Sequence, residues 1–330
     1  MYRVIMVPTD GTGFDREAIR VALRIAERTE AKVKLVRVLG TGSFFAVAAA
    51  AEGTAVAAEV VRSERDRALS ELYALAAECR TVSSVAISVD LHAGPVTEVL
   101  EDYARRHEVD LIVISTHGRS GIARMSLGSV TDSLIRHTSI PVLVVKPPTS
   151  YLNPQAGEAF SHVVVPLDGS TLAEQILPPI ALLTSLEGAD LTLLHVIKAQ
   201  RPARGEITNP DLAWWERDIK SAQNYLQRVS RQLRRRSGLR VKTDIVVSQN
   251  VPSAISDFAA REKVDLIAIA THGRGGLARV LRGSVADAVL HLANRSMLVF
   301  KPENVLAKEA VLEANTILSV SSTTVDLLPA

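Results

Sequence analysis

The sequence contains a single cysteine, Cys79, among its 330 residues. One thiol can form no disulfide within the chain, and it cannot supply the Cys-x-x-Cys pairs of a zinc site. The 38 basic and 36 acidic residues leave a formal net charge of only +2, whereas nucleic-acid-binding proteins usually carry a strong positive charge. We therefore expect neither a disulfide scaffold nor a nucleic-acid partner.

The sequence also lacks a long apolar run. Its most apolar stretch, residues 44–61, is interrupted by Glu52, Gly53 and Glu59, although a membrane helix needs about 20 consecutive apolar residues. The N-terminal MYRVIMVPTD leads directly into a strand-like pattern, without the basic, apolar and small-residue regions of a signal peptide. These features predict a cytoplasmic protein that has no membrane partner.

What the sequence does contain is a long internal repeat. Residues 115–129, STHGRSGIARMSLGS, and residues 270–284, ATHGRGGLARVLRGS, are identical at nine of fifteen positions. Other matching segments follow the same order in both halves, at offsets between 155 and 158 residues. Solenoid repeats are about 20 to 50 residues long, so this period indicates two whole domains. The predicted units are residues 1–147, a linker at 148–160, residues 161–302 and a tail at 303–330.

Short apolar runs alternate with longer segments of helical periodicity in each half. Residues 15–29 repeat apolar side chains at helical spacing, whereas residues 110–115 are almost continuously apolar, as in a strand that is covered on both faces. The expected order is five strands with four helices between them. This alternation predicts the α/β class, with two repeated doubly wound domains, each a five-stranded parallel sheet flanked by helices.

The repeated phrase lies between the fourth expected strand and the fourth expected helix of each half. Ligands of open parallel sheets bind at the carboxyl ends of the strands, and glycines let the backbone come close to a ligand. Gly128-Ser129 opens a helix whose free N–H groups and dipole favour an anion such as phosphate. Arg119 and Arg124 add positive charge. The sequence therefore predicts a phosphate site here.

The same helix starts also fit an explanation that needs no ligand. Ser129 with Asp132, and Ser284 with Asp287, have the spacing of a capping box, in which side chains satisfy the first N–H groups of the helix. The residues by themselves leave both interpretations open.

Other chemistries are disfavoured when the two halves are compared. DGTGF at 10–14 has lost its second glycine in the second half, which argues against a dinucleotide fingerprint. Ser120 in GRSG becomes Gly275, which argues against a nucleophilic serine, and no GxxxxGK[ST] loop is present. His117 and His272 have no second ligand at metal spacing. We therefore expect neither a metal site nor enzyme activity.

The chain resembles a tandem universal stress protein over both predicted domains. In that family the fourth strand is followed by Gly, two residues, Gly, nine residues, then Gly and Ser or Thr, and this segment holds the phosphates of ATP. The matching residues are Gly118 with Gly128-Ser129, and Gly273 with Gly283-Ser284. The first glycine of the pattern is replaced by Ser115 in one half and by Ala270 in the other.

The resemblance implies a Rossmann-like fold of the adenine-nucleotide alpha-hydrolase type that binds ATP, with Mg²⁺ as the accompanying ion. The family's first-strand aspartate matches Asp10 and Asp168, and its backbone contact to adenine matches Val38 and Val196. An aspartate before Gly-Thr or Gly-Ser is also a common turn former, and the two roles are compatible. The implied ATP contacts in the first half are Pro8, Thr9, Asp10, Val38, Ser115, His117, Gly118, Arg119, Gly128, Ser129, Val130 and Thr131. Those in the second half are Pro166, Leu167, Asp168, Val196, Ala270, His272, Gly273, Arg274, Gly283, Ser284, Val285 and Ala286.

Two classes of function then remain, with an enzyme as a third. The first is a nucleotide-binding stress-response or signalling module, and the second is an interaction scaffold of the same fold that binds no nucleotide. The third is a slow ATPase. We expect the first half to bind nucleotide more tightly, because it has Gly94 before its third helix where the second half has Val251. Arg282, immediately before Gly283, argues in the other direction, since its charge either favours phosphate in the second half or is simply solvated.

Each predicted domain ends in an apolar strand, at residues 141–146 and 296–301, which we expect at the edge of its sheet. An exposed apolar edge invites pairing with another strand, and the resemblance implies dimerisation through this last strand. We therefore predict an intramolecular pseudo-dimer in which Val142–Val145 and Leu298–Phe300 meet. Any homo-oligomer would use other surfaces.

Overall fold

The computed structural model describes residues 1–13, 15–40, 55–115, 127–146, 160–199, 209–271 and 284–302. The elements of the first half are β1 (Val4–Pro8), α1 (Arg16–Thr29), β2 (Lys32–Gly40), α3 (Ala55–Val82), β3 (Ile87–Gly94), α4 (Val96–Arg106), β4 (Leu111–Ser115), α5 (Ser129–His137) and β5 (Val142–Val145). Those of the second half are β6 (His162–Pro166), α6 (Thr171–Glu174), α7 (Leu177–Glu187), β7 (Asp190–Lys198), α8 (Asn209–Ser237), β8 (Val241–Ser248), α9 (Val251–Arg261), β9 (Leu266–Ala270), α10 (Ser284–Leu292) and β10 (Ser296–Phe300).

The strands of both halves form one continuous sheet. Its order is β3-β2-β1-β4-β5-β10-β9-β6-β7-β8 among the described strands. Neighbouring strands within each half run parallel, and β5 and β10, where the halves meet, run antiparallel. The predicted α/β class, with two five-stranded parallel sheets flanked by helices, is confirmed.

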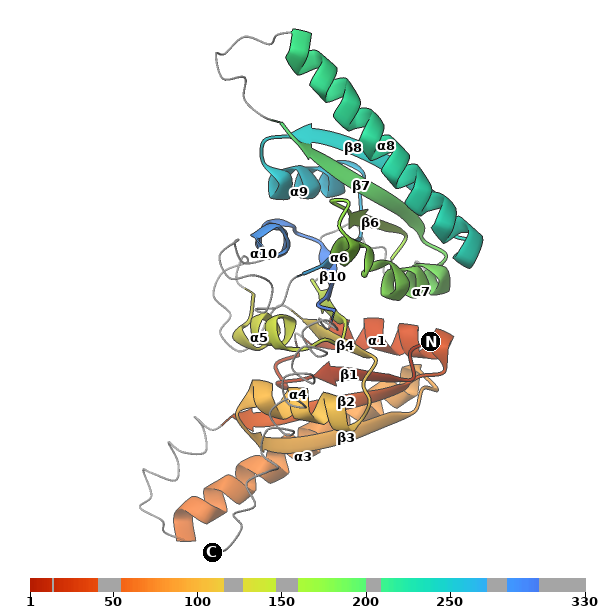
Figure 1. The fold of residues 1–330 in the computed structure, drawn as a ribbon. Coiled ribbons are helices and arrows are strands. Elements are labelled where there is room, and N and C mark those ends of the chain that lie inside the picture. The colour runs from red at the N-terminus through yellow and green to blue at the C-terminus, as the bar shows by residue number, and fades with distance from the viewer. Residues whose placement is uncertain are drawn as a thin grey trace, which may run out of the picture.

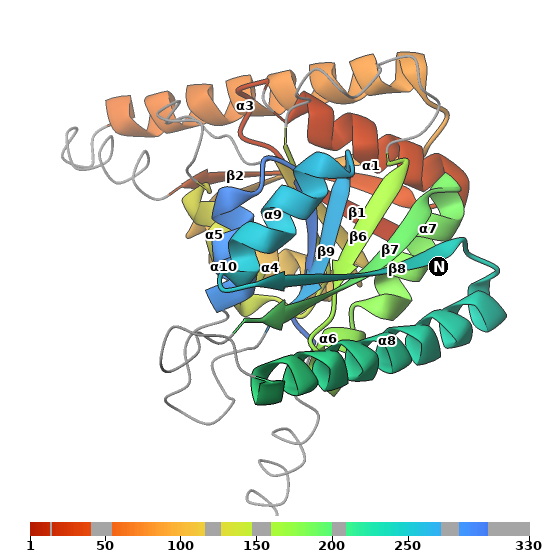
Figure 2. The ribbon, with the colours of Figure 1, turned by 90° about the horizontal axis from the view of Figure 1, so that it is seen from above.

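Helices cover both faces of this sheet (Figure 1). Helices α1, α3, α7 and α8 pack on one face, where buried residues from both halves make a single apolar cluster. Helices α4, α5, α9 and α10 pack on the opposite face over a second cluster, and Figure 2 shows α9 and α10 lying together on that side. The central strands such as β4 and β9, which are covered on both faces, are almost continuously apolar, as residues 110–115 indicated, whereas the edge strands β3 and β8 carry polar and exposed residues.

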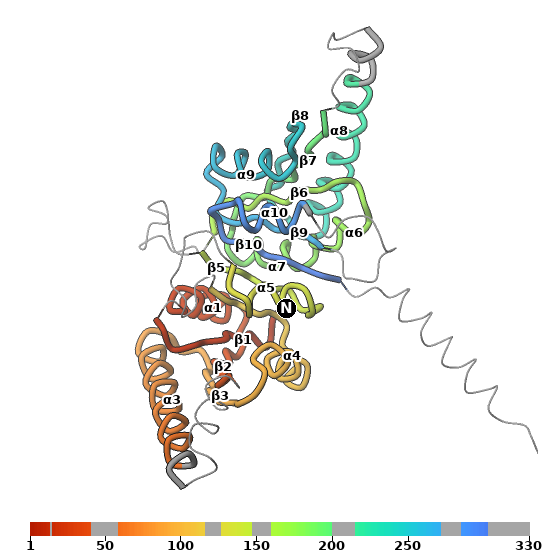
Figure 3. Tube along the Cα trace, turned by 90° about the vertical axis from the view of Figure 1, so that its left-hand side faces the viewer, coloured from red at the N-terminus to blue at the C-terminus, as the bar shows by residue number. Residues whose placement is uncertain are grey.

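The longest helices, α3 and α8, lie at opposite ends of the sheet (Figure 3). Each packs on the edge strand that follows it in sequence, α3 on β3 and α8 on β8. Within the part of the chain that the structure describes, no helix is long and apolar enough to cross a bilayer.

One predicted helix is divided in the structure. The helix expected after the first strand of the second half is the short α6 followed by α7. Pro178 and Pro179 occupy the first turn of α7, and proline has no N–H to continue a preceding helix and restricts the residue before it. The helix therefore starts anew at Leu177, and the prediction of a single helix in this segment was wrong.

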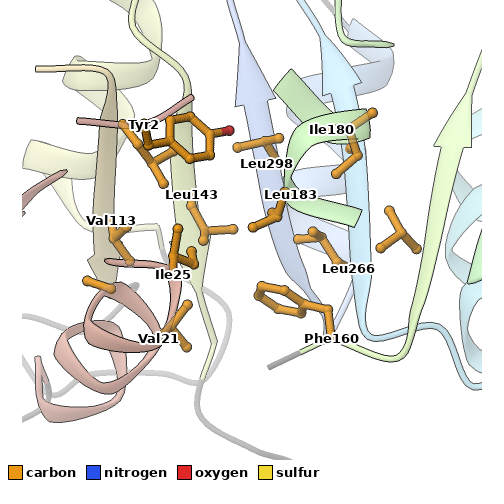
Figure 4. Packing of buried hydrophobic residues seen from close by; sticks show 14 of the residues in the cluster. Tyr2, Val21, Ile25, Val113, Leu143, Phe160, Ile180, Leu183, Leu266 and Leu298 are labelled. Atoms are coloured by element: carbon orange, nitrogen blue, oxygen red, sulfur yellow. The ribbon is translucent and has the colours of Figure 1, made fainter. Parts of the chain in front are cut away.

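The halves meet through an apolar pair of strands. Strands β5 and β10 pair in the register Val142–Val299, Leu143–Leu298 and Val144–Met297, and all six side chains are buried. Figure 4 shows Leu143 and Leu298 in the cluster that also holds residues of α1 and α7. Each buried side chain of this size contributes roughly 1.5–3 kcal/mol, so the halves share a core.

Two lysines that follow these strands extend to helices of the other half. The Lys146 ammonium donates to the backbone carbonyls of Leu290, at 3.1 Å, and Ala293, near the end of α10. The Lys301 ammonium donates to the carbonyl of Arg136, at 2.6 Å, in the last turn of α5. A positive charge is favourable at a helix C-terminus. Each half therefore stabilises the end of the other half's last helix.

Removing the Lys146 side chain should change how stability depends on pH. Burial lowers the pKa of Lys146 in the folded chain below 10.5, the usual value, which applies to the unfolded chain. At a pH between the folded and the unfolded pKa, the unfolded chain therefore holds a proton that the folded chain has lost. Stability then rises with pH, by at most about 1.4 kcal/mol per pH unit. We expect wild type to gain stability relative to Lys146→Met as the pH rises toward 10.5. Urea unfolding from pH 7 to 10.5 measures this, with exposed Lys32→Met as the control. A difference that does not vary with pH would contradict it.

Candidate functional site

A cavity of about 230 Å³ opens at the carboxyl ends of the parallel strands in the second half. Its walls come from the ends of β6, β7 and β9 and from the first turns of α6, α9 and α10. This is the edge of the sheet at which ligands of such folds bind. Seven of the residues expected to bind nucleotide line it: Pro166, Leu167, Asp168, Val196, Ala270, Val285 and Ala286.

Backbone hydrogen bonds fix the loop that follows β6. The Leu167 amide donates to the Leu194 carbonyl at 2.8 Å, which extends the pairing with β7. Asp168 is exposed, and its Oδ1 accepts from the Ser170 amide at 2.9 Å. The aspartate therefore forms the turn that its sequence predicted, and it lies in the cavity wall at the same time.

The cavity has further walls that the repeated phrase did not indicate. The sequence prediction omitted Ser170, Leu172, Ala173, Leu194, Val251, Ile255, Ile269 and Thr271. Val251 and Ile255 are four residues apart on α9, so the helical periodicity of that segment was the signal that could have identified them. They make this side of the cavity apolar, as suits the face of a planar base.

The first half brings the corresponding residues to the same edge of its own sheet. The Thr9 amide donates to the Val36 carbonyl at 2.9 Å, as Leu167 does to Leu194. Asp10 Oδ1 accepts from the amide of Thr12 at 2.9 Å and from its hydroxyl at 2.6 Å. The buried Thr131 hydroxyl donates to the Ser115 carbonyl at 3.4 Å, which joins the first turn of α5 to the end of β4.

The capping box expected at the start of α5 is not formed. The N-cap is Gly128, with φ −61° and ψ 144°, so exposed Ser129 is the first helical residue, and no side chain caps the helix. Asp132 instead pairs with Arg136 at 2.8 Å. The capping-box interpretation was wrong for this half, because Gly128 moves Ser129 one residue past the capping position. The first N–H groups of α5 therefore lack the side-chain acceptor of a capping box.

Part of the predicted site lies outside the described residues, namely His117, Gly118, Arg119, His272, Gly273, Arg274 and Gly283. Of the rest, Pro8 ends β1, Val38 is half-buried on β2, and half-buried Val130 is in the first turn of α5. Ser284 begins α10. The expected contacts of the repeated loop with phosphate therefore stay a prediction.

The two halves differ before their third helices. Gly94 has φ +143°, a value that favours glycine, and a Cβ there would lie 3.0 Å from Val99 Cγ2. In the second half α9 already begins at Val251, because Asn250 caps it by accepting from the Ser253 amide at 3.1 Å. The valine side chain lines the cavity, and which half binds nucleotide more tightly stays a prediction.

Comparison with known proteins assigns the family. The sequence model of the universal stress protein family matches twice, at residues 1–146 and 159–301. The chain belongs to the universal stress protein family. Universal stress protein MJ0531 of Methanocaldococcus jannaschii is 35% identical over 150 residues, which cover 45% of this chain and 84% of that protein. Universal stress protein Mb2019 of Mycobacterium bovis is 27% identical over 320 residues, 89% of this chain and 94% of that one.

Solved structures share the tandem architecture of this universal stress protein. PA1789 of Pseudomonas aeruginosa superimposes with a TM-score of 0.64, at 16% identity, and the match covers 95% of this chain and 98% of that one. A universal stress protein of Archaeoglobus fulgidus gives a TM-score of 0.56, also at 16% identity, over 91% of this chain and 98% of that one. At this identity the likeness establishes a common fold.

Proposed function

We propose that this universal stress protein binds ATP in each half and acts as a nucleotide-dependent stress-response or signalling module. The observation that supports this most is the second-half cavity, in which seven of the predicted residues, from four segments of the chain, come together. The start of α10 lies in its wall, and the proposal places the phosphate at the free N–H groups and the positive end of the helix dipole there.

The proposed pose follows from the lining. The base lies against the apolar side chains of Val251 and Ile255 and reaches the backbone near Val196, while Asp168 stands beside the ribose. The phosphates extend toward Ser284 and the repeated glycine loop, with Mg²⁺ accompanying them. The first half would use Val38, Asp10 and Ser129 in the same way. No catalytic step is part of this proposal.

Substitution of the two loop glycines should remove the sites one at a time. Because a β-branched side chain would block the close backbone approach to phosphate, we expect two ATP per chain in wild type and one in Gly118→Val or Gly273→Val. The double variant should bind none. Titration calorimetry measures this, and the first half should be the tighter site. Equal ATP binding by wild type and the double variant would show that the site is misplaced.

A second variant tests the cavity through a described residue. Ala270→Phe should fill the second cavity and remove one ATP equivalent, whereas the same change at exposed Ala260 on α9 should leave both sites intact. Mass spectrometry of nucleotide released from the purified protein, together with a turnover assay, distinguishes the alternatives. Absence of bound nucleotide and of ATP binding would favour the scaffold, and steady release of ADP would favour a slow ATPase.

We also infer that the β5–β10 pairing makes the chain an intramolecular pseudo-dimer in solution. The apolar register of the two strands and the exchanged lysine contacts support this inference. The linker keeps the halves at a high effective concentration around each other, which favours pairing within the chain over pairing between chains.

A further inference from the structure

A second cavity, of about 490 Å³, adjoins the nucleotide cavity of the second half. It lies between the carboxyl end of β7, the loop after β6 and one side of α8, and it shares Asp168 and Val196 with its neighbour. We call it the α8 chamber. Its polar lining includes two carboxylates, Asp168 and Asp218, together with His195, Lys198 and Tyr225. The proposed ATP pose does not use this space.

The first half contains the same place in the fold, and the correspondence can be made residue by residue. Helices α3 and α8 match at an offset of 154 residues, at which their buried positions coincide: Ala68 and Ala222, Leu72 and Leu226, and Cys79 and Leu233. Strands β2 and β7 match at an offset of 158 residues. The residues that correspond around the chamber are Arg37 and His195, Glu71 and Tyr225, and Gly11 and Gly169.

In the first half an arginine of the chain itself fills this place. The Arg37 side chain is only 5% exposed and pairs with Glu71 at 2.7 Å. Its guanidinium lies over the backbone of Gly11, where an added Cβ would meet Nη1 at 2.7 Å and Cζ at 3.1 Å. The first half therefore shows that a planar guanidinium fits over this loop when a carboxylate on the following helix accepts its hydrogen bonds.

In the second half none of the described residues fills the same space. No described atom lies within 4 Å of a Cβ built on Gly169. The counterpart of Arg37 is His195, whose side chain is shorter. Its Nδ1–H donates to the Leu167 carbonyl at 2.7 Å, which fixes the orientation of the imidazole ring. The described residues that line the chamber thus keep the loop with its aspartate, Asp168, and add Asp218 on α8, but Tyr225 stands where Glu71 does in the first half, and none of these lining residues is an arginine.

Tyr225 also lines the chamber. Burial, and after it the charge and hydrogen bonding of the Glu174 carboxylate, raise the pKa of the Tyr225 hydroxyl, so the phenol stays neutral and is engaged with Glu174. Arg228 lies over the Tyr225 ring at 5.4 Å and approaches Glu174 at 3.7 Å, and it is not part of the chamber lining.

We propose that the α8 chamber binds a small organic cation that carries a guanidinium group, in the place that the Arg37 guanidinium occupies in the first half. The planar group lies over Gly169, and its N–H groups donate to Asp168 and Asp218. A guanidinium suits the site better than an ammonium ion, because it is flat, weakly hydrated and able to donate to two carboxylates in a fixed geometry. This site goes beyond the proposed function and needs no nucleotide.

Agmatine is the probe that tests the site, because it joins a guanidinium to a short chain without a carboxylate. Calorimetry on the full chain without nucleotide should show one saturable site below about 10 mM. His195→Arg, which supplies the first half's own guanidinium, should weaken binding at least about tenfold, as should Asp218→Asn. Exposed Asp257→Asn on α9 makes the same change of charge outside the chamber and should leave affinity unchanged.

The reverse exchange tests the correspondence between the halves. Arg37→His should open the first-half chamber beside Glu71 and raise the stoichiometry to two agmatine per chain, with circular dichroism confirming that the variant is folded. Failure of wild type to bind agmatine, or undiminished binding by His195→Arg, would overturn the proposal. Equal binding of butylamine would show a site for any cation and would also overturn it. Since nucleotide is absent throughout, these outcomes are independent of ATP binding.

Discussion

Val144→Asp should lower the free energy of unfolding by about 4 kcal/mol or more, or prevent folding altogether. Val144 is fully buried, lies in the middle of β5 and pairs with Met297 across the junction of the two halves. A carboxylate there would lose its hydration in the apolar cluster around it, and the nearby ammonium of Lys146 is already held by carbonyls at the end of α10. Changes of this size are restricted to a few mechanisms, of which a buried unpaired charge is one.

Chemical unfolding followed by circular dichroism measures this effect, and the chain provides a matched control. Val247 lies on edge strand β8 and is 44% exposed, so Val247→Asp should cost less than about 1 kcal/mol. Val144→Ala should fall between the two, because it leaves a small cavity and buries no charge. If both aspartate variants were equally stable, β5 could not be buried against β10 in solution.

A fragment of residues 1–150 should form a homodimer. In the full chain Leu143 of β5 pairs with Leu298 of β10, and because the strands are antiparallel the residue before Leu143 pairs with the residue after Leu298, and the reverse. Position 298 corresponds to 143 at the repeat offset of 155 residues, so two copies of β5 can pair antiparallel in the same register, with Leu143 opposite Leu143. A surface that complements itself in this way gives a closed twofold dimer.

Light scattering after size exclusion measures the mass of the fragment directly. Val144→Asp in the fragment should yield a monomer or an insoluble product, because it places two charges in the new interface. Addition of a fragment of residues 159–302 should displace the homodimer in favour of the natural pair, which has the exchanged lysine contacts as well. A soluble, monomeric 1–150 fragment would rule out the pseudo-dimer inference.

The sequence predicted most of the fold because the repeat and the strand pattern each carry a strong physical signal. Buried parallel strands need continuous apolar runs, so residues 110–115 could be recognised as β4 without a structure. The divided helix α6–α7 was missed, although Pro178 and Pro179 provided a local signal for it. The first half has no prolines at the matching positions, so the repeat itself gave no sign of this break.

The site was harder to predict from the sequence, because its structure depends on details of one residue, such as a cap that is shifted by one position or a single side chain that differs between the halves. Whether Ser129 or Gly128 caps α5 is decided by a backbone torsion that the sequence pattern does not contain. The contrast between Arg37 and His195 is visible in the alignment, yet its meaning appears only when one guanidinium is seen over Gly11 and the space over Gly169 is seen open. The conformations of loops and helix N-termini therefore could not be predicted from the sequence, whereas the buried strands could.

The order of synthesis gives the β5–β10 pairing a further consequence. Strand β5 leaves the ribosome about 150 residues before β10, which at roughly 5–20 residues per second leaves its apolar edge without a partner for about 8–30 s. During that time the first half of one nascent chain can pair with that of its neighbour on the same message. Replacement of such an intermolecular β5–β5 pair by the intramolecular β5–β10 pair would then be a slow step in biogenesis. Slower translation of the second half would increase the yield of chains that are joined through β5.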